Sequence, residues 1–202
     1  MSNPNSPFGF AWMGAAPGGP PVTGCQRKFK IATANNTPIC FGDVVQQLST
    51  GYIAIGAASV AGSLTAGVFV GCRYLSTARG EQVYSSYWPN GDHAYDGEAY
   101  VIPIAGNTPQ LFRVQAYSTS FAFSDVGANC DIHVGTQSIN GGYGLSGITL
   151  DQGSLGTTAT LPFRIVNLYS AYVPSGTPGT DDSSNYAQVV VTSNPDYETG
   201  IN

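Results

Sequence analysis

The chain has 202 residues, of which 42% are hydrophobic and only 9% are charged, and its formal net charge is −5. A typical soluble domain has about 25% charged residues, so this chain lacks the Lys and Glu side chains that usually cover exposed helices. Its Tyr, Phe, Val, Ile and Thr residues suit pleated strands. The seven Lys and Arg residues include one small cluster, at residues 27–30, which is too little to neutralise a phosphate backbone. The composition predicts an all-β protein that binds no nucleic acid and whose sparsely charged surface is covered by partners.

The N-terminal 24 residues combine five prolines and five glycines with large apolar side chains. The prolines and glycines exclude a long helix or a central strand, whereas a solvated tail would lack the apolar anchors. We expect residues 1–27 to form an extended arm and residues 28–202 a single β-rich domain. The arm either reaches a neighbouring subunit, which we favour, or folds back on its own domain. Its candidate partner-binding residues are Phe8, Phe10, Trp12 and Met13.

From residue 28 onward the sequence changes to short alternating stretches. KFKIA places Phe29 and Ile31 on one face of a strand. ICFGDVVQQL and GYIAIG predict a hairpin with its turn at residues 49–51. In TAGVFVGCRYL, alternation predicts one side of a strand that carries Val68, Val70, Cys72 and Tyr74.

The rest of the chain continues as strands separated by turn residues. Further strands are expected at 98–104, 110–117, 131–134, 147–150, 158–171 and 186–192. FSDVGANC predicts one helical turn capped by Ser124 or Asp125, and residues 173–185 predict a long loop. Short strands at this spacing, without a long helical period, predict a β-barrel or β-sandwich with an extended N-terminal arm.

The stretch GGYGLSG matches the G-x-G-x-x-G spacing of a dinucleotide-binding loop at Gly142, Gly144 and Gly147. Such a loop needs a helix N-terminus after it to hold the pyrophosphate. Here ITLDQGSLGTT follows, which is β-branched and interrupted by glycine, and no acid lies about twenty residues on. We therefore expect a glycine-rich passage into a strand and no cofactor.

Three further groups of residues are candidate sites. NGDHAYDGE (90–98) carries oxygen ligands suited to Ca²⁺ but lacks the EF-hand spacing, so a solvated turn is favoured and no metal is expected. His133 is expected to be a surface or packing residue of a strand. Tyr84, Tyr87 and Trp88 suit either sugar stacking or an apolar core. No nucleophile–base pair, G-x-S-x-G or H-E-x-x-H is present, so the sequence does not predict an enzyme.

The cysteines form no C-x-x-C pair and stand at no metal-finger spacing from a histidine; they are Cys25, Cys40, Cys72 and Cys130. We expect reduced thiols that pack as small apolar residues, with a disulfide between Cys25 and Cys40 as the alternative. No signal peptide and no apolar run of transmembrane length is evident. These features predict a chain made in the cytoplasm, without a membrane partner.

The order of short segments along the chain suggests a family. The segments are NSPFGF, CQRKFKI, FGDVV, AGVFVGCRYL, SSYWP, LFRVQA, DVGANCDI, GLSGITLD and FRIVNLY. Their succession, from Pro7 to about Val191, resembles virion structural proteins of tailed bacteriophages, in particular head decoration (cement) proteins. The resemblance implies a β-rich fold, no catalytic residues and a dimer or trimer on the outer surface of a shell of major capsid protein.

Composition and resemblance together predict a decoration protein at the capsid surface of the virion. It would bridge neighbouring capsid subunits and so stabilise the head. The alternative is a carbohydrate- or receptor-binding module of a phage fibre or baseplate, which would use Tyr84, Tyr87, Trp88 and residues 90–98.

Overall fold

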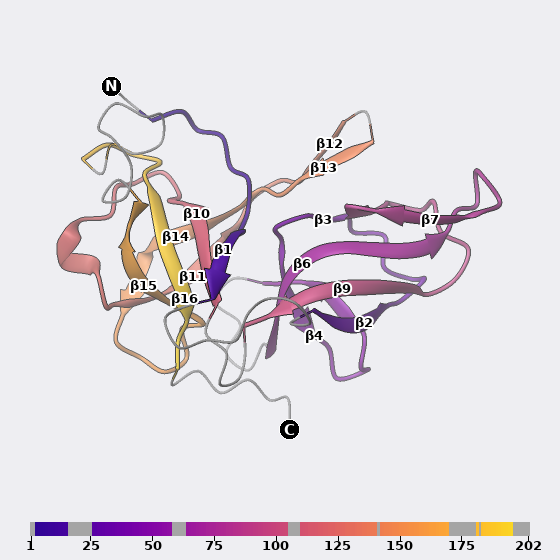
Figure 1. Ribbon diagram of the computed structural model, residues 1–202, viewed down its shortest axis with the longest axis horizontal. Helices are drawn as coiled ribbons and strands as arrows, with labels where there is room; N and C mark the ends of the chain where they lie inside the picture. Colours follow the sequence, from indigo (N-terminus) through magenta and orange to yellow (C-terminus); the bar gives the residue numbers. More distant parts are fainter. Residues whose placement is uncertain are drawn as a thin grey trace.

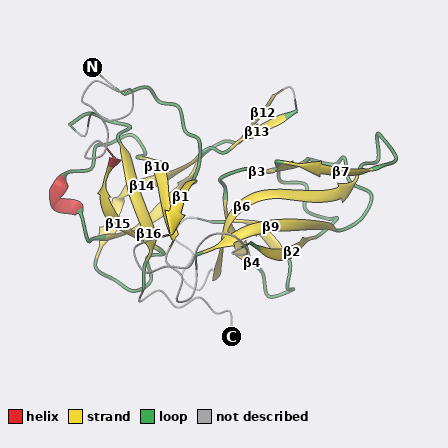
Figure 2. Ribbon diagram, in the orientation of Figure 1, coloured by secondary structure: helices red, strands yellow, loops and turns green. Residues whose placement is uncertain are grey.

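The computed structural model describes residues 3–15, 26–57, 64–104, 110–140, 142–169, 181 and 183–195. These residues form antiparallel strands, turns and short 3-10 turns, among them η1 (Phe123–Asp125) (Figure 2). The prediction of an all-β fold is therefore confirmed.

Two six-stranded sheets make up most of the molecule (Figure 1). Sheet 1 has the order β1 (Ala11–Ala15), β10 (Gln110–Gln115), β16 (Gln188–Ser193), β15 (Phe163–Leu168), β11 (Asn129–Val134) and β14 (Ile148–Gly156). Sheet 2 has the order β2 (Arg27–Ile31), β9 (Gly97–Pro103), β6 (Leu64–Leu75), β4 (Val44–Gln47) and β5 (Ile53–Ile55), and β7 (Gln82–Ser85) pairs with β6. In the sequence, all strands of sheet 2 therefore fall in the segment between β1 and β10 of sheet 1.

Both sheets curl toward barrels. In sheet 1 the backbone N–H of Tyr117, just beyond β10, donates to the carbonyl of Leu150 in β14 at 2.9 Å, and Ala116 bridges Leu150. In sheet 2 a parallel bridge joins Lys30 of β2 to Tyr52, just before β5. In sheet 2 the two edge strands thus meet, whereas in sheet 1 β14 meets β10, the neighbour of the other edge strand β1. Both contacts reduce the length of open strand edge.

Each sheet encloses an apolar cluster. The cluster of sheet 1 also takes in apolar residues at the ends of β4, β6 and β9, and includes Phe10, Val68, Phe112, Phe121, Leu150 and Phe163. The cluster of sheet 2 includes Ile31, Val45, Phe69, Trp88 and Val101. Continuity of the first cluster into sheet 2 joins the two halves through buried apolar surface.

The prediction that alternating residues of β6 share one side of the strand is wrong. Val68 and Val70 pack on the cluster of sheet 1, whereas Cys72 and Tyr74 pack with Phe69 on the cluster of sheet 2. The pairing of β6 with β9 shifts register between Phe69 and Gly71. A β-bulge adds one residue to a strand and so reverses which face the following side chains occupy.

Most other local predictions hold, with corrections at the helical turn and at the strand expected over 158–171, where β15 covers only Phe163–Leu168. The hairpin of β4 and β5 is present, and Phe29 and Ile31 are the least exposed residues of β2. Ser124 and Asp125 lie inside η1 rather than before it, and the N-cap residue is Ala122. Asp125 nevertheless acts at this end, because its Oδ2 accepts the backbone N–H of Ala122 at 2.8 Å.

Candidate binding surface

The described part of the N-terminal arm lies on this chain's own sheet 1. The side-chain amide of Gln115 donates to the carbonyl of Pro4 at 2.9 Å, and its Oε1 accepts the N–H of Ser6 at 3.1 Å. Strand β1 then pairs antiparallel with β10. For residues 3–15 the structure thus shows the folded-back alternative and not the reach to a neighbouring subunit that we favoured.

The four candidate anchors of the arm separate into two kinds. Phe10 is 1% exposed and packs on the rings of Phe112 and Phe163, so it is a core residue and not a surface for a partner. Phe8 is half-buried, with the Arg113 guanidinium 5.0 Å from its ring centroid. Trp12 and Met13 are exposed on β1, the edge strand of sheet 1. Of the four, these two remain accessible.

A second exposed apolar surface was not predicted. Strands β12 (Ser138–Asn140) and β13 (Tyr143–Leu145) form a two-stranded hairpin between β11 and β14. The hairpin leaves sheet 1 and projects over sheet 2, near β3 (Ile39–Cys40) (Figure 1). A parallel bridge between Phe41 and Leu145 joins its base to the end of β3.

Gly142 and Gly144 of GGYGLSG allow the chain to form this hairpin and to pack it on sheet 2. Asn140 pairs with Tyr143, which leaves two residues for the turn, and Gly142 has a φ of +89°, the conformation that two-residue hairpin turns require. A Cβ on Gly144 would lie 2.6 Å from Cβ of Tyr87 and 2.8 Å from Sγ of Cys40. Gly144 therefore allows the hairpin to rest on β3 and β8 (Tyr87–Trp88), and no helix follows that could hold a pyrophosphate.

We name the exposed apolar side chains at this place the hairpin patch: Phe41, Ile139, Tyr143 and Leu145. Tyr143 is 75% exposed and Leu145 is 58% exposed. Residues 135–147 contain no Asp, Glu, Lys, Arg or His. Tyr143 and Leu145 share one face of the hairpin, and Ile139 lies with Gly144 on the face toward β3 and β8. Exposed apolar side chains on an uncharged, projecting hairpin have the character of a protein-docking site.

Replacing Gly144 by valine is expected to lower the free energy of unfolding by about 1–3 kcal/mol. The added methyl groups would push the hairpin away from Tyr87 and Cys40. Chemical denaturation measures the effect, and Ser138→Val on the exposed strand β12 is the control. Equal stability of the two variants would contradict the close packing of Gly144.

A buried carboxylate links the hairpin to sheet 2. Asp43 is fully buried; its Oδ2 accepts the backbone N–H of Cys40 at 2.7 Å, and its Oδ1 accepts the hydroxyl of Ser146 in a short hydrogen bond. Burial raises the pKa of Asp43 to about 6, and the hydrogen bonds from Ser146 and Cys40 offset only part of this effect. This group connects residues 103 positions apart in the sequence.

The polar loop at residues 90–98 is exposed at Tyr95 and Asp96, as expected of a solvated turn, but its carboxylates also hold neighbouring segments. Asp92 accepts hydrogen bonds from the side chain of Ser76 and from the backbone N–H of Ala78. Asp96 accepts from the backbone N–H of Thr33, at 2.9 Å, and from the hydroxyl of Tyr52. The backbone N–H groups of Ala78 and Thr33 are the main reason that the pKa values of Asp92 and Asp96 lie below the usual range.

The histidines are both packing residues. His93 is buried, with 4.3 Å between the centroids of its ring and that of Trp88. Its Nε2 lies 2.8 Å from the carbonyl oxygen of Thr33. His133 stacks on Tyr117 with 3.5 Å between ring centroids, as predicted for a surface or packing residue. Within the described part of the chain, no three His, Cys, Asp or Glu side chains gather to hold a metal ion.

The three aromatic residues considered for sugar stacking, Tyr84, Tyr87 and Trp88, do not share one exposed surface. Trp88 is fully buried in the cluster of sheet 2, and its Nε1–H donates to the carbonyl of Asn35 at 2.9 Å. Tyr84 is exposed on β7, and Tyr87 is half-buried beneath the hairpin. Trp88 therefore belongs to the core, the second of the two alternatives expected for it.

Cys40, Cys72 and Cys130 are free and buried thiols, as expected of small apolar residues. Burial raises the pKa of Cys40 and of Cys72 to about 12, so neither is a reactive thiolate at neutral pH. Cys25 lies outside the described residues. The long loop expected at residues 173–185 is described only at residues 181 and 183–185.

None of the described residues forms a helix that could span a membrane. Comparisons of the chain with protein-family models, with curated proteins and with solved structures give no match.

Proposed function

We propose that this chain is a decoration (cement) protein that binds the outer surface of a bacteriophage capsid. The observation that carries the proposal is the hairpin patch, where Ile139, Tyr143 and Leu145 stand exposed on an uncharged hairpin beside exposed Phe41. The resemblance of the segment order to head decoration proteins names the partner as major capsid protein. In this proposal the chain is made in the host cytoplasm and acts on the virion as a homo-oligomer, a dimer or a trimer.

The proposed mechanism is bridging of neighbouring capsid subunits. The hairpin patch supplies one contact, and Trp12 and Met13 on the edge strand β1 supply another. A protein held at two points gains effective concentration for the second contact, so modest interfaces add up to firm attachment. Enzymatic catalysis is no part of this mechanism.

The experiment that tests the proposal is a binding assay on heads that lack the protein. We expect saturable binding at hundreds of copies per particle, at a fixed position in averaged images of the particle. Absence of the chain from native virions, or no binding to heads, would contradict the proposal. Particle imaging also gives the oligomeric state on the shell.

The double variant Tyr143→Ser/Leu145→Ser is expected to weaken binding to heads at least 30-fold, because loss of interface anchors costs about 2 kcal/mol or more. Both side chains are exposed, so the fold should be retained. Phe123→Ser is the matched control, since Phe123 is also exposed but lies in η1, the red turn far from the hairpin in Figure 2. Similar losses in both variants would contradict the role of the hairpin patch.

A carbohydrate- or receptor-binding module of a fibre or baseplate has weaker support. Its main stacking residue, Trp88, is buried, which leaves Tyr84 as the exposed ring of that group. A glycan array separates the two functions, because saturable binding to a defined sugar would favour this alternative.

A further inference from the structure

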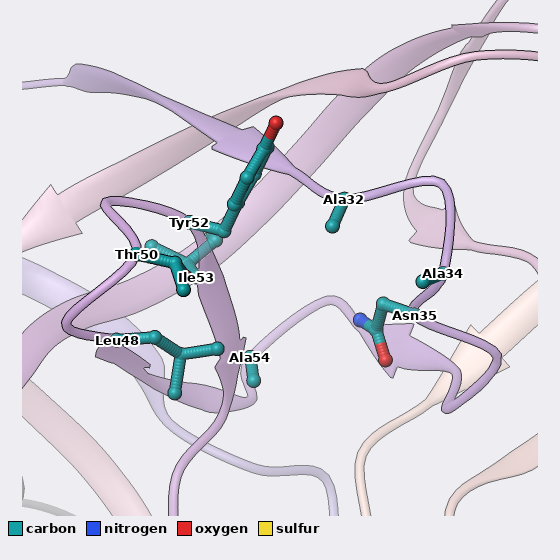
Figure 3. A pocket seen from close by; sticks show the side chains of 8 residues that line it. All are labelled: Ala32, Ala34, Asn35, Leu48, Thr50, Tyr52, Ile53 and Ala54. Carbon is teal, nitrogen blue, oxygen red and sulfur yellow. The ribbon is translucent and has the colours of Figure 1, made fainter.

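A small pocket opens in sheet 2, on a part of the chain that the proposed function does not use. Its volume is about 260 Å³, and Figure 3 shows its walls on both sides of the opening. One wall follows β2 and the other is the hairpin of β4 and β5. The lining residues are Ala32, Ala34, Asn35, Leu48, Thr50, Tyr52, Ile53 and Ala54.

The pocket lies between the two edges of the curled sheet 2, where the chain after β2 separates from β5. Lys30 bridges Tyr52 in parallel, but β2 ends at Ile31 and the chain then turns, with the N–H of Asn35 donating to the carbonyl of Ala32 at 2.9 Å. Strand β5 is the outermost strand of its sheet. Along Ile53–Ile55, its outer edge therefore has no strand partner among the described residues.

Asn35 supplies an unused hydrogen-bond donor. Its backbone carbonyl accepts Nε1–H of Trp88 at 2.9 Å, and its Oδ1 accepts the N–H of Thr37 at 3.1 Å. The bond from Thr37 fixes the orientation of the amide, because a reversed amide would place NH₂ against N–H. Nδ2 is buried and has no hydrogen-bond partner among the residues that the structure describes, and Figure 3 shows it directed into the opening. A buried donor of this kind calls for an acceptor from outside.

The chemistry of the lining restricts the occupant. The residues around the pocket carry no formal charge, and most of their side chains are aliphatic. The volume is below the 300–1,000 Å³ that is usual for small-molecule sites, and suits a single side chain. An aliphatic group next to a carbonyl oxygen, presented beside an unpaired strand edge, is what an extended polypeptide offers.

We propose that this pocket binds one aliphatic side chain of an uncharged, extended segment of a partner polypeptide. In this arrangement a main-chain carbonyl of that segment accepts Nδ2–H of Asn35, and its backbone lies along the outer edge of β5. The inference is independent of the proposed attachment to a capsid. Failure of head binding would leave it unaffected, and failure of the test below would leave the hairpin patch unaffected.

The test is a titration of the isotope-labelled full chain with capped peptides, followed by nuclear magnetic resonance. Acetyl-Thr-Leu-Thr-amide is expected to shift the side-chain amide signals of Asn35 and the backbone signal of Ala54 in a saturable manner. Acetyl-Thr-Gly-Thr-amide, which lacks the side chain, should bind about tenfold more weakly or less. Acetyl-Leu-amide, which cannot pair along β5, should also bind more weakly than the leucine tripeptide.

A matched pair of charge-adding variants isolates the donor. Asn35→Asp keeps an acceptor for the N–H of Thr37 but removes Nδ2–H, and should weaken binding of the leucine tripeptide about tenfold or more, since the lost bond is replaced by repulsion between oxygens. Asn36→Asp adds the same charge at an exposed neighbour and should bind nearly as the native chain does. Ala34→Leu, at the exposed rim, should fill the pocket and abolish binding.

Three results would overturn the inference. These are the absence of a saturable shift with the leucine tripeptide, equal binding of the glycine tripeptide, and equal effects of Asn35→Asp and Asn36→Asp. Equal affinity of acetyl-Leu-amide and the leucine tripeptide would overturn the part that concerns β5.

Discussion

Replacing Phe10 with alanine is expected to lower the free energy of unfolding by about 3–5 kcal/mol, the usual cost of removing a buried phenylalanine. The Phe10 ring lies 4.6 Å from that of Phe163 and 6.1 Å from that of Phe112, measured between centroids. Its N–H also donates to the carbonyl of Gly42 at 2.8 Å. The N-terminal segment is therefore part of the core of sheet 1, and urea denaturation measures its contribution.

Phe8→Ala is the control for this prediction. Phe8 is half-buried and its ring contacts the guanidinium of Arg113, an interaction of about 0.5–1 kcal/mol at such sites. A loss below 1 kcal/mol in Phe10→Ala would show that the segment is not docked in solution.

The burial of Phe10 also decides how the arm should be tested for partner binding. Deletion of residues 1–24 would remove Phe10 and the whole of β1, so weaker attachment of the truncated chain to heads would reflect unfolding as well as lost contacts. The variants Trp12→Ser and Met13→Ser change exposed side chains and leave the core residue in place. They are the cleaner test of this second contact.

The stability of the chain is expected to carry a pH-dependent contribution from Asp43 that falls as the pH rises. Its pKa in the folded chain is about 6, against 3.8 for the unfolded reference. The folded chain thus binds the proton more tightly, and the contribution of Asp43 is greatest below pH 3.8 and declines as the pH rises through 6. At about 1.4 kcal/mol per pKa unit, the full decline is about 3 kcal/mol.

The measurement is the free energy of unfolding between pH 4 and pH 8 for the native chain and for Asp43→Asn. The asparagine cannot ionise but retains an oxygen that can accept from Ser146 or Cys40, so its profile should lack the Asp43 contribution. Asp92 and Asp96 act in the opposite direction, because their lowered pKa values give stability that is lost as the pH falls below about 4. The difference between the two profiles isolates Asp43. Parallel profiles would contradict the raised pKa.

Elements set by local sequence were predictable. The alternation in KFKIA gave the buried face of β2, and turn residues between two apolar runs gave the β4–β5 hairpin. The same reasoning was wrong in β6, because the bulge near Gly71 depends on how the strand pairs with β9. A bulge that depends on pairing with a strand distant in the sequence leaves no periodic pattern in the local sequence, so it could not be predicted from that pattern.

The candidate binding surfaces were also predictable only in part. The arm was recognised as unusual from its prolines and apolar anchors, but only the fold distinguishes Phe10 in the core from exposed Trp12 and Met13. The β12–β13 hairpin carried a local signal, a Gly-Gly pair between short polar–apolar stretches, that the resemblance to a cofactor motif concealed. The pocket at Asn35 had no such signal, because residues 32–35 and 48–54 form it only after sheet 2 has curled.

The chain order of the two sheets has a consequence for synthesis on the ribosome. All strands of sheet 2 fall within residues 27–103, so this half can assemble as soon as they have emerged. Sheet 1 contains β1 from the beginning of the chain, whereas β16, near its end, lies between β10 and β15. Because closing such long loops is slow, we expect the nascent protein to carry a finished half and an incomplete half until β16 (Gln188–Ser193) has emerged. During that interval the apolar residues of the incomplete half are the ones that chaperones would need to protect.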